Sequence, residues 1–153
     1  MEDLEARVDE FVRATEEYWL TVKYEFNKNF KKITKSGILM TDIYLGSGIG
    51  TATLSKYNNN HGLPNKRHVD LLFDYLLRTF WFEDTDMYKT CMKLKRLEKL
   101  IHQKAFMLNG NQASACRLMG IGRKTLHDWS GQRFPTRQTV YWMRENFNRN
   151  TNK

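Results

Sequence analysis

The sequence predicts an all-α protein in which a unit of two helices and a short turn occurs twice behind an N-terminal helix. Over most of the chain, apolar residues recur at three-, four- and seven-residue steps, the spacing of one face of an α-helix. Gly-Ile-Gly followed after two residues by Thr-Leu occurs at 48–54 and again at 120–126, 72 positions later. We therefore expect an N-terminal amphipathic helix, a first domain, a linker and a second domain, at residues 1–22, 23–82, 83–86 and 87–150.

Residues 3–33 are expected to form one or two amphipathic helices. Their apolar side chains make a single stripe, widened by Trp19 and Tyr24, along Leu4, Val8, Phe11, Tyr18, Val22 and Phe26. In the simpler interpretation the stripe packs on the chain's own domain, and in the alternative it is a dimerisation or partner-binding arm. Near the end of this segment, where cations favour the helix dipole, the chain carries Lys28, Lys31, Lys32 and Lys35.

Residues 36–82 contain the first copy of the repeated unit. After a break at Ser36-Gly37, we expect a short helix at 41–45, a turn at 46–49 and a second helix at 50–58. The Asn- and Gly-rich segment 58–64 favours a loop, because these residues tolerate turn conformations. A further helix, closed by Phe80-Trp81-Phe82, then carries an apolar face made of Val69, Leu71, Leu72, Tyr75 and Leu76.

A single helix over residues 87–108 is expected to join the two copies, while Glu83-Asp84-Thr85-Asp86 is the linker candidate. The apolar residues in step along this helix are Met87, Cys91, Leu94, Leu97, Ile101 and Ala105. The other sides of this helix are basic and carry Lys93, Lys95, Arg96, Lys99 and Lys104. These residues form either a solvated surface or a surface that contacts phosphates.

The second copy, residues 110–147, has the clearer pattern. Small Ala115 and Cys116 let two helices approach closely, and Gly120 supplies a turn in which positive φ is often needed. Ile121 is expected to plug the turn with an apolar side chain. Of the next helix, Leu126 and Trp129 face inward. The copies match further in the pairs Tyr57 and Trp129, Pro64 and Pro135, and Val69 and Val140.

Charge and composition narrow the classes of function. The 153-residue chain has a net charge of +8 and a pI near 9.5, although its first 20 residues hold seven acids and only two arginines. A basic body of this kind favours a polyanionic partner. The chain has two cysteines, of which Cys116 is expected to be a buried thiol, and they fit a reducing compartment. No apolar run reaches the length of a membrane span. We expect a cytoplasmic, nucleoid-associated protein with no cofactor or metal, because the histidines lack metal-ligand spacing.

The second copy resembles the helix-turn-helix of the Fis family. The family signature of Gly-Asn-Gln, small residues, an apolar pair, Gly-Ile, Arg and Thr-Leu is met by Gly110, Asn111, Gln112, Ala115, Met119, Gly120, Ile121, Arg123, Thr125 and Leu126. The sequence departs at Gly122, where the family usually has an Asn or Ser N-cap. Gly is an acceptable cap, so the helix start is weakened rather than lost.

The longer pattern, with Trp129, Pro135 and a following helix, is similar to the lambda-repressor-like (Cro/Xre) family. The first copy, from about Lys23 to Phe80, fits the same five-helix plan. It departs at residues 45–48, Leu-Gly-Ser-Gly, where the family has one glycine after its apolar residue. Together these resemblances imply two tandem helix-turn-helix domains, the unit that places one short helix in the major groove of DNA.

The resemblance implies two sets of groove-facing residues and a set of phosphate contacts. The outward positions of the first recognition helix are Thr51, Ala52, Ser55, Lys56 and Asn59. Those of the second are Arg123, Lys124, His127 and Asp128. The phosphate contacts are Gln112, Lys66, Arg67, Arg133 and Arg137. Their chemistry suits groove reading, since Arg pairs with guanine, Asn with adenine, and Ala or Thr methyls touch thymine.

We therefore expect a sequence-specific regulator of transcription that binds double-stranded DNA, of phage or mobile-element origin. One alternative is an interaction protein that binds RNA polymerase or another host protein, or dimerises, through its N-terminal helix. Another is an architectural or DNA-packaging protein with little base specificity. We do not expect an enzyme, because about 50 residues outside the two copies leave no room for an ordinary catalytic domain.

Overall fold

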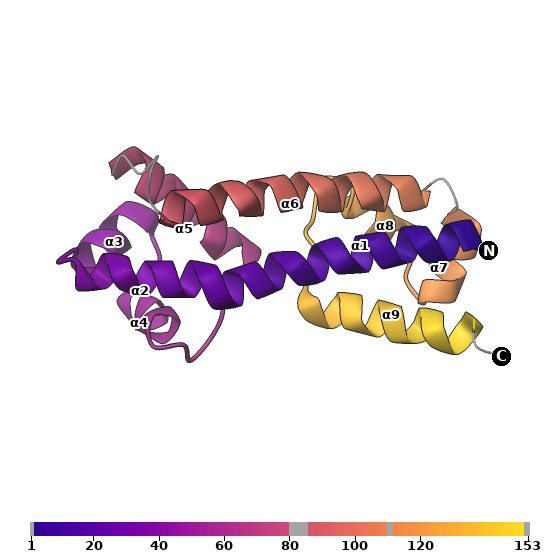
Figure 1. Cartoon of the computed structure of the whole chain (residues 1–153), viewed down its shortest axis with the longest axis horizontal. Helices are drawn as coiled ribbons and strands as arrows, with labels where there is room; N and C mark the ends of the chain where they lie inside the picture. The colour runs from indigo at the N-terminus through magenta and orange to yellow at the C-terminus, as the bar shows by residue number, and fades with distance from the viewer. Residues whose placement is uncertain (1, 80–85, 110–111, 152–153) are drawn as a thin grey trace. The chain divides into compact units, whose positions relative to one another are not determined.

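The computed structural model describes residues 2–79, 86–109 and 112–151, and every regular element in these ranges is a helix (Figure 1). The all-α prediction is confirmed. In chain order the elements are α1 (Glu2–Thr21), the π-helical η1 (Val22–Phe26), α2 (Asn27–Lys35), α3 (Met40–Ser47), α4 (Thr51–Asn58), α5 (Lys66–Thr79), α6 (Asp86–Asn109), α7 (Gln112–Met119), α8 (Arg123–Asp128) and α9 (Arg137–Thr151). The predicted closing residues Phe80-Trp81-Phe82 and linker residues Glu83-Asp84-Thr85 lie outside the described ranges.

The chain divides into two compact units. The first unit is Leu20–Leu94 and contains the first copy of the repeat, in α3 and α4. The second unit joins Met1–Trp19 to Lys95–Lys153 and contains the second copy, in α7 and α8. The boundaries expected from the sequence were residue 22 and residues 83–86. In the structure the N-terminal residues group with the C-terminal part of the chain, and helix α6 is divided between the two units after Leu94.

The apolar stripe of the N-terminal helix packs against other residues of the same chain. Leu4, Val8 and Phe11 are buried in the second unit, where the ring of Phe11 stacks on Trp129 with centroids 5.4 Å apart. Tyr24 was expected on this stripe, and that is wrong, because 61% of its surface is exposed. It lies two residues from both Val22 and Phe26 in η1, so its side chain points away from the side of the helix on which those two are buried.

The acids of α1 neutralise cations of their own unit. Asp9 forms an ion pair with Arg144, and a Glu10 carboxylate oxygen lies 2.7 Å from the Lys104 ammonium. Lys104 holds the pKa of Glu10 below its ordinary value, through a hydrogen bond and through its charge. The acidic face and the apolar stripe of α1 therefore both make contacts within the second unit.

In the first unit, glycines end two helices and allow two others to pack closely. Gly37, with φ of +105°, follows α2, and Gly48, with φ of +81°, ends α3. The turn predicted at 46–49 is shorter than expected, because Gly46 and Ser47 are the last residues of α3. A Cβ on Gly46 would overlap the buried ring of Tyr75, so the extra glycine gives α5 room to approach α3.

Helix α6 has the core predicted for it. All six of its expected apolar residues are buried. Several cations on its other sides form ion pairs, since Lys93 lies 2.9 Å from Glu25 in the first unit and Lys95 lies 3.7 Å from Glu98 in the second. Asp86, expected in the linker, instead begins α6 and lies 3.4 Å from Lys32. These contacts favour the solvated, ion-paired interpretation of the α6 surface over phosphate binding.

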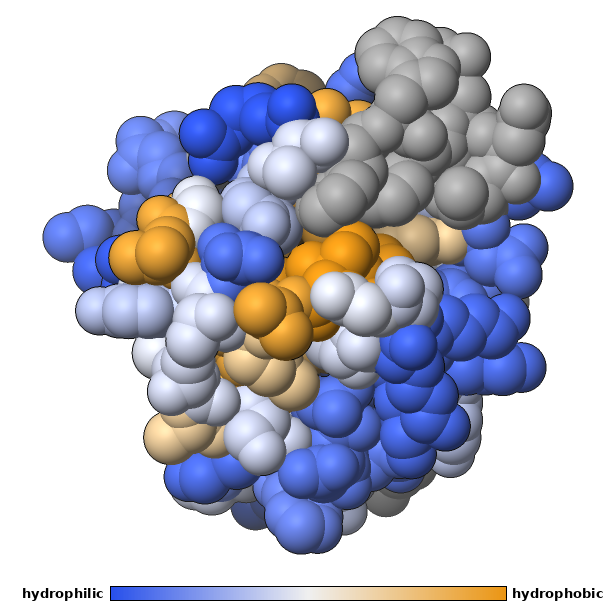
Figure 2. Space-filling view, turned by 90° about the vertical axis from the view of Figure 1, so that its left-hand side faces the viewer, coloured by the Kyte–Doolittle hydropathy of each residue, from blue (hydrophilic) through white to orange (hydrophobic). Residues whose placement is uncertain are grey.

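The face of the molecule that carries α3 shows apolar side chains among polar ones (Figure 2). Large apolar residues exposed on α3 and beside it include Leu39, Tyr44 and Leu45.

Within the part of the chain that the structure describes, none of the helices combines the length and apolar character needed to cross a lipid bilayer. In the same ranges, no three His, Cys, Asp or Glu side chains gather closely enough to hold a metal ion.

Candidate nucleic-acid interface

The two Gly-Ile-Gly segments adopt the same backbone conformation. Gly48 and Gly120 both take the left-handed conformation, with φ of +81° and +67°. Two residues later, Gly50 and Gly122 are extended, with φ of −58° and −78°, and begin α4 and α8. A left-handed φ is sterically unfavourable for any residue that carries a Cβ. The turn therefore requires the first glycine of each segment. The first and third residues of the two segments therefore have similar φ angles.

The cores behind the two turns match as well. Leu54 of α4 and its counterpart Leu126 of α8 are fully buried, and Tyr57 and Trp129, each three residues later, are buried too. Ile121 departs from the pattern, because it is only partly buried while Ile49 is buried. The apolar plug predicted at Ile121 is thus better developed in the first unit than in the second.

The loop after each short helix ends in the same way. Pro64 and Pro135 are buried, and the next residue caps the following helix. The Asn65 carboxamide oxygen accepts the backbone N–H of His68 at 2.8 Å, and the Thr136 hydroxyl accepts that of Thr139 at 3.2 Å. Both are N-cap bonds to the third helical residue. These caps were not predicted, although Asn and Thr directly after proline could have indicated them.

Helix α4 presents the face expected from the sequence. The residues predicted to face outward on it are all exposed, namely Thr51, Ala52, Ser55, Lys56 and Asn59. The Asn59 amide donates a hydrogen bond to the Ser55 hydroxyl at 3.3 Å. This surface is small, polar and rich in methyl groups, with a single cation.

Helix α8 presents three of the four expected side chains. Arg123, Lys124 and His127 are exposed. Asp128 was expected to face outward, and that is wrong, because only 7% of its surface is exposed. The chain turns back over it, since its carbonyl oxygen accepts the backbone N–H of Gln132 at 2.7 Å and of Arg133 at 2.8 Å. The exposed surface of α8 is therefore more cationic than the sequence indicated.

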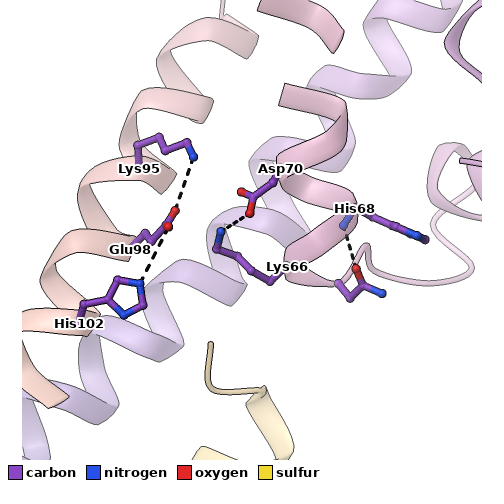
Figure 3. A network of polar contacts seen from close by, with 7 residues as sticks. Lys66, His68, Asp70, Lys95, Glu98 and His102 are labelled. Atoms are coloured by element: carbon purple, nitrogen blue, oxygen red, sulfur yellow. Dashed lines mark hydrogen bonds and ion pairs between the residues drawn. The ribbon is translucent and has the colours of Figure 1, made fainter. Parts of the chain in front are cut away.

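The candidate phosphate contacts differ in accessibility. Arg67, Arg133 and Arg137 are exposed. Lys66 is mostly buried and forms an ion pair with Asp70 one turn along α5 (Figure 3). Gln112 begins α7, but its side chain lies outside the described residues. The three arginines are thus the accessible members of this set.

Each unit brings one stretch of chain to its surface without an exposed carboxylate. Residues 43–69 contain no Asp or Glu and three Lys or Arg. Residues 109–144 contain six Lys or Arg and one acid, the buried Asp128. The other acids lie elsewhere along the chain, so the exposed charged side chains of α4 and α8 themselves are cationic.

The loop that follows α8 is braced by the N-terminal helix. The Trp19 indole N–H donates to the carbonyl oxygen of Pro135 at 3.2 Å, and the ring of Tyr18 lies 4.6 Å from that of Phe134. His102 of α6 hydrogen-bonds the Trp129 carbonyl oxygen through Nδ1 at 2.7 Å. These contacts fix the chain between α8 and α9, and no sequence motif indicated them.

Burial changes the pKa of three groups near these surfaces. The Tyr57 hydroxyl and His68 Nδ1 lie 2.6 Å apart. Burial raises the pKa of Tyr57 and, with the charge of Arg67, lowers that of His68. Burial also raises the pKa of the Cys116 thiol, although the Arg123 charge opposes this, as expected for a structural thiol between helices.

No family model, curated protein or solved structure matches this chain.

Proposed function

We propose that the protein binds double-stranded DNA with sequence specificity and thereby regulates transcription, using α4 and α8 as recognition helices. One observation carries the proposal. Two copies of a short helix follow a glycine in the left-handed conformation, and each lies in a stretch of chain with exposed cations and no exposed carboxylate. A short exposed helix that follows a tight turn is the element that enters the major groove in helix-turn-helix proteins.

The two helices are suited to different bases. Arg123 at the start of α8 can form two hydrogen bonds to guanine. On α4, the Thr51 and Ala52 methyl groups suit thymine. Arg67 and Arg133 follow the two recognition helices at positions suited to phosphate contacts. We therefore expect a site with a G·C-containing part read by α8 and an A·T-containing part read by α4.

The test is selection from random double-stranded DNA at low salt, followed by affinity measurements on the selected sequence. Arg123→Ala is expected to cost about 1–3 kcal/mol and to relax specificity at one base pair. Arg149→Ala is the matched control, because Arg149 is an exposed arginine of the same unit, on α9, outside the candidate set. Wild-type affinity of the Arg123 variant, or an equal loss in the Arg149 variant, would contradict the assignment of α8.

The salt dependence separates specific from architectural binding. Affinity for the selected site should fall steeply with the logarithm of salt concentration, because phosphate contacts release counterions. DNA binding with no enriched motif would favour an architectural protein. An absence of DNA binding at low salt would exclude both the sequence-specific regulator and the architectural protein. The alternative of a docking arm at the N-terminus has less support, because most apolar residues of α1, with the exception of Leu20, are buried within the chain.

A further inference from the structure

Helix α9 exposes two large aromatic side chains side by side. Tyr141 is 62% exposed and Trp142 is 64% exposed, while the residues on the opposite face of α9, Val140, Met143 and Phe147, are buried in the second unit. Tryptophan is usually largely buried, and exposed aromatic clusters mark interaction surfaces. In the first unit the counterparts of this pair are Asp70 and Leu71. The aromatic pair is therefore a feature of one copy and is not required by the repeat.

A shallow pocket of about 330 Å³ opens beside this pair. Its lining is mainly apolar and includes the glycine turn and the exposed edge of α9, namely Gly120, Ile121, Gln138, Thr139, Trp142, Met143 and Asn146. In the first unit the counterpart of Asn146 is Tyr75, whose buried ring packs against Gly46 and leaves Gly48 open, since a Cβ there would meet nothing within 4 Å. The second unit has a short amide at this position, and its Ile121 is left partly exposed.

Charges of both signs flank the aromatic pair. Arg137 lies one turn before Tyr141 and Glu145 one turn after it, and the Tyr141 hydroxyl donates to a Glu145 carboxylate oxygen at 2.9 Å. Glu145 is the only acid in residues 129–151. If two copies of α9 cross in opposite directions at Tyr141, each Glu145 comes opposite Arg137 of the other copy.

We propose that this surface binds a second copy of the chain, in a two-fold symmetric dimer whose aromatic pairs enter each other's pockets. A two-fold interface requires a self-complementary patch. This one has an exposed aromatic pair, a pocket beside Trp142 and a charge pair of opposite sign, all along α9. The inference is independent of the proposed DNA binding, except that it withdraws Arg137 from the candidate phosphate contacts.

The experiment is sedimentation equilibrium of the full chain without DNA over a range of protein concentrations. The wild-type mass should rise from one chain to two. Tyr141→Ala and Trp142→Ala should raise the dimer dissociation constant at least about tenfold. Tyr24→Ala and Phe106→Ala are matched controls, because these rings are 61% and 69% exposed elsewhere, and they should leave the constant unchanged. Far-UV circular dichroism checks that each variant keeps its helices.

A charge exchange tests the antiparallel crossing. Glu145→Arg and Arg137→Glu should each weaken the dimer, and the double variant should restore it, because the pair is then reversed in both contacts. A wild-type chain that stays monomeric at every concentration would overturn the proposal. So would an equal weakening by Tyr24→Ala, or a double variant no stronger than the two single ones.

Discussion

Substituting Gly120 is expected to destabilise the protein for two separable reasons. Its φ of +67° is unfavourable for alanine by about 1–2 kcal/mol. A Cβ there would also lie 2.6 Å from Nδ2 of Asn146, which donates to the Met119 carbonyl oxygen at 3.3 Å. Moving Asn146 aside loses that hydrogen bond, which contributes about 0.5–1.5 kcal/mol. Gly120→Ala should therefore cost about 1.5–3.5 kcal/mol in total.

Two comparisons isolate these terms in urea unfolding followed by far-UV circular dichroism. Gly48→Ala should cost only the strain of about 1–2 kcal/mol, because its φ is +81° but a Cβ there would meet nothing within 4 Å. In an Asn146→Ala background, Gly120→Ala should likewise cost only the strain, so the two substitutions are coupled. If Gly120→Ala costs no more than Gly48→Ala, or if its cost is the same in both backgrounds, the reasoning about the turn is refuted.

Three further results are expected from equilibrium unfolding of the full chain. Asn65→Ala should lower the unfolding free energy by about 1 kcal/mol through loss of the α5 cap, and an unchanged urea midpoint would count against that cap. Trp19→Phe should cost about 1 kcal/mol, because the indole hydrogen bond to Pro135 is lost while the ring is largely kept, and no cost would mean that the bond adds nothing. Because burial lowers the pKa of His68, the folded chain binds fewer protons there than the unfolded chain, so stability should fall as pH drops below about 6.5. His68→Gln should reduce this loss of stability at low pH, while His61→Gln, at an exposed position, should not. An equal dependence of the unfolding free energy on pH in the two variants would contradict the assignment to His68.

The sequence predicted the helices well because their signals are local. Periodic apolar residues mark the faces of α1, α5 and α6, and glycines mark the turns at residues 48 and 120. The backbone conformation of these turns depends on a few neighbouring residues, so one chain's pattern is enough to indicate it.

The features that the sequence did not predict depend on how a loop turns back on itself or on contacts between distant residues. Asp128 is polar and follows exposed positions, but the returning chain covers it. Gly46 resembled a turn residue, while its role is to make room for the ring of Tyr75 on another helix. The brace from Trp19 to Pro135 joins residues 116 positions apart. No local pattern encodes such pairings.

The candidate site was predicted in outline by the same local logic. Helical spacing correctly separated exposed from buried positions on α4, because that short helix has one covered face. The pairing of Lys66 with Asp70, four residues later on the same helix, was missed although helical spacing could have indicated it.

The most direct test of the central proposal is an NMR titration of the 18.2 kDa chain with its selected DNA, followed through backbone amide shifts. The account predicts the largest changes at the start of α8, at Arg123 and Lys124, and at the start of α4, at Thr51 and Ala52. Changes confined to α1 or α6, with these four amides unaffected, would contradict the assignment of the recognition helices.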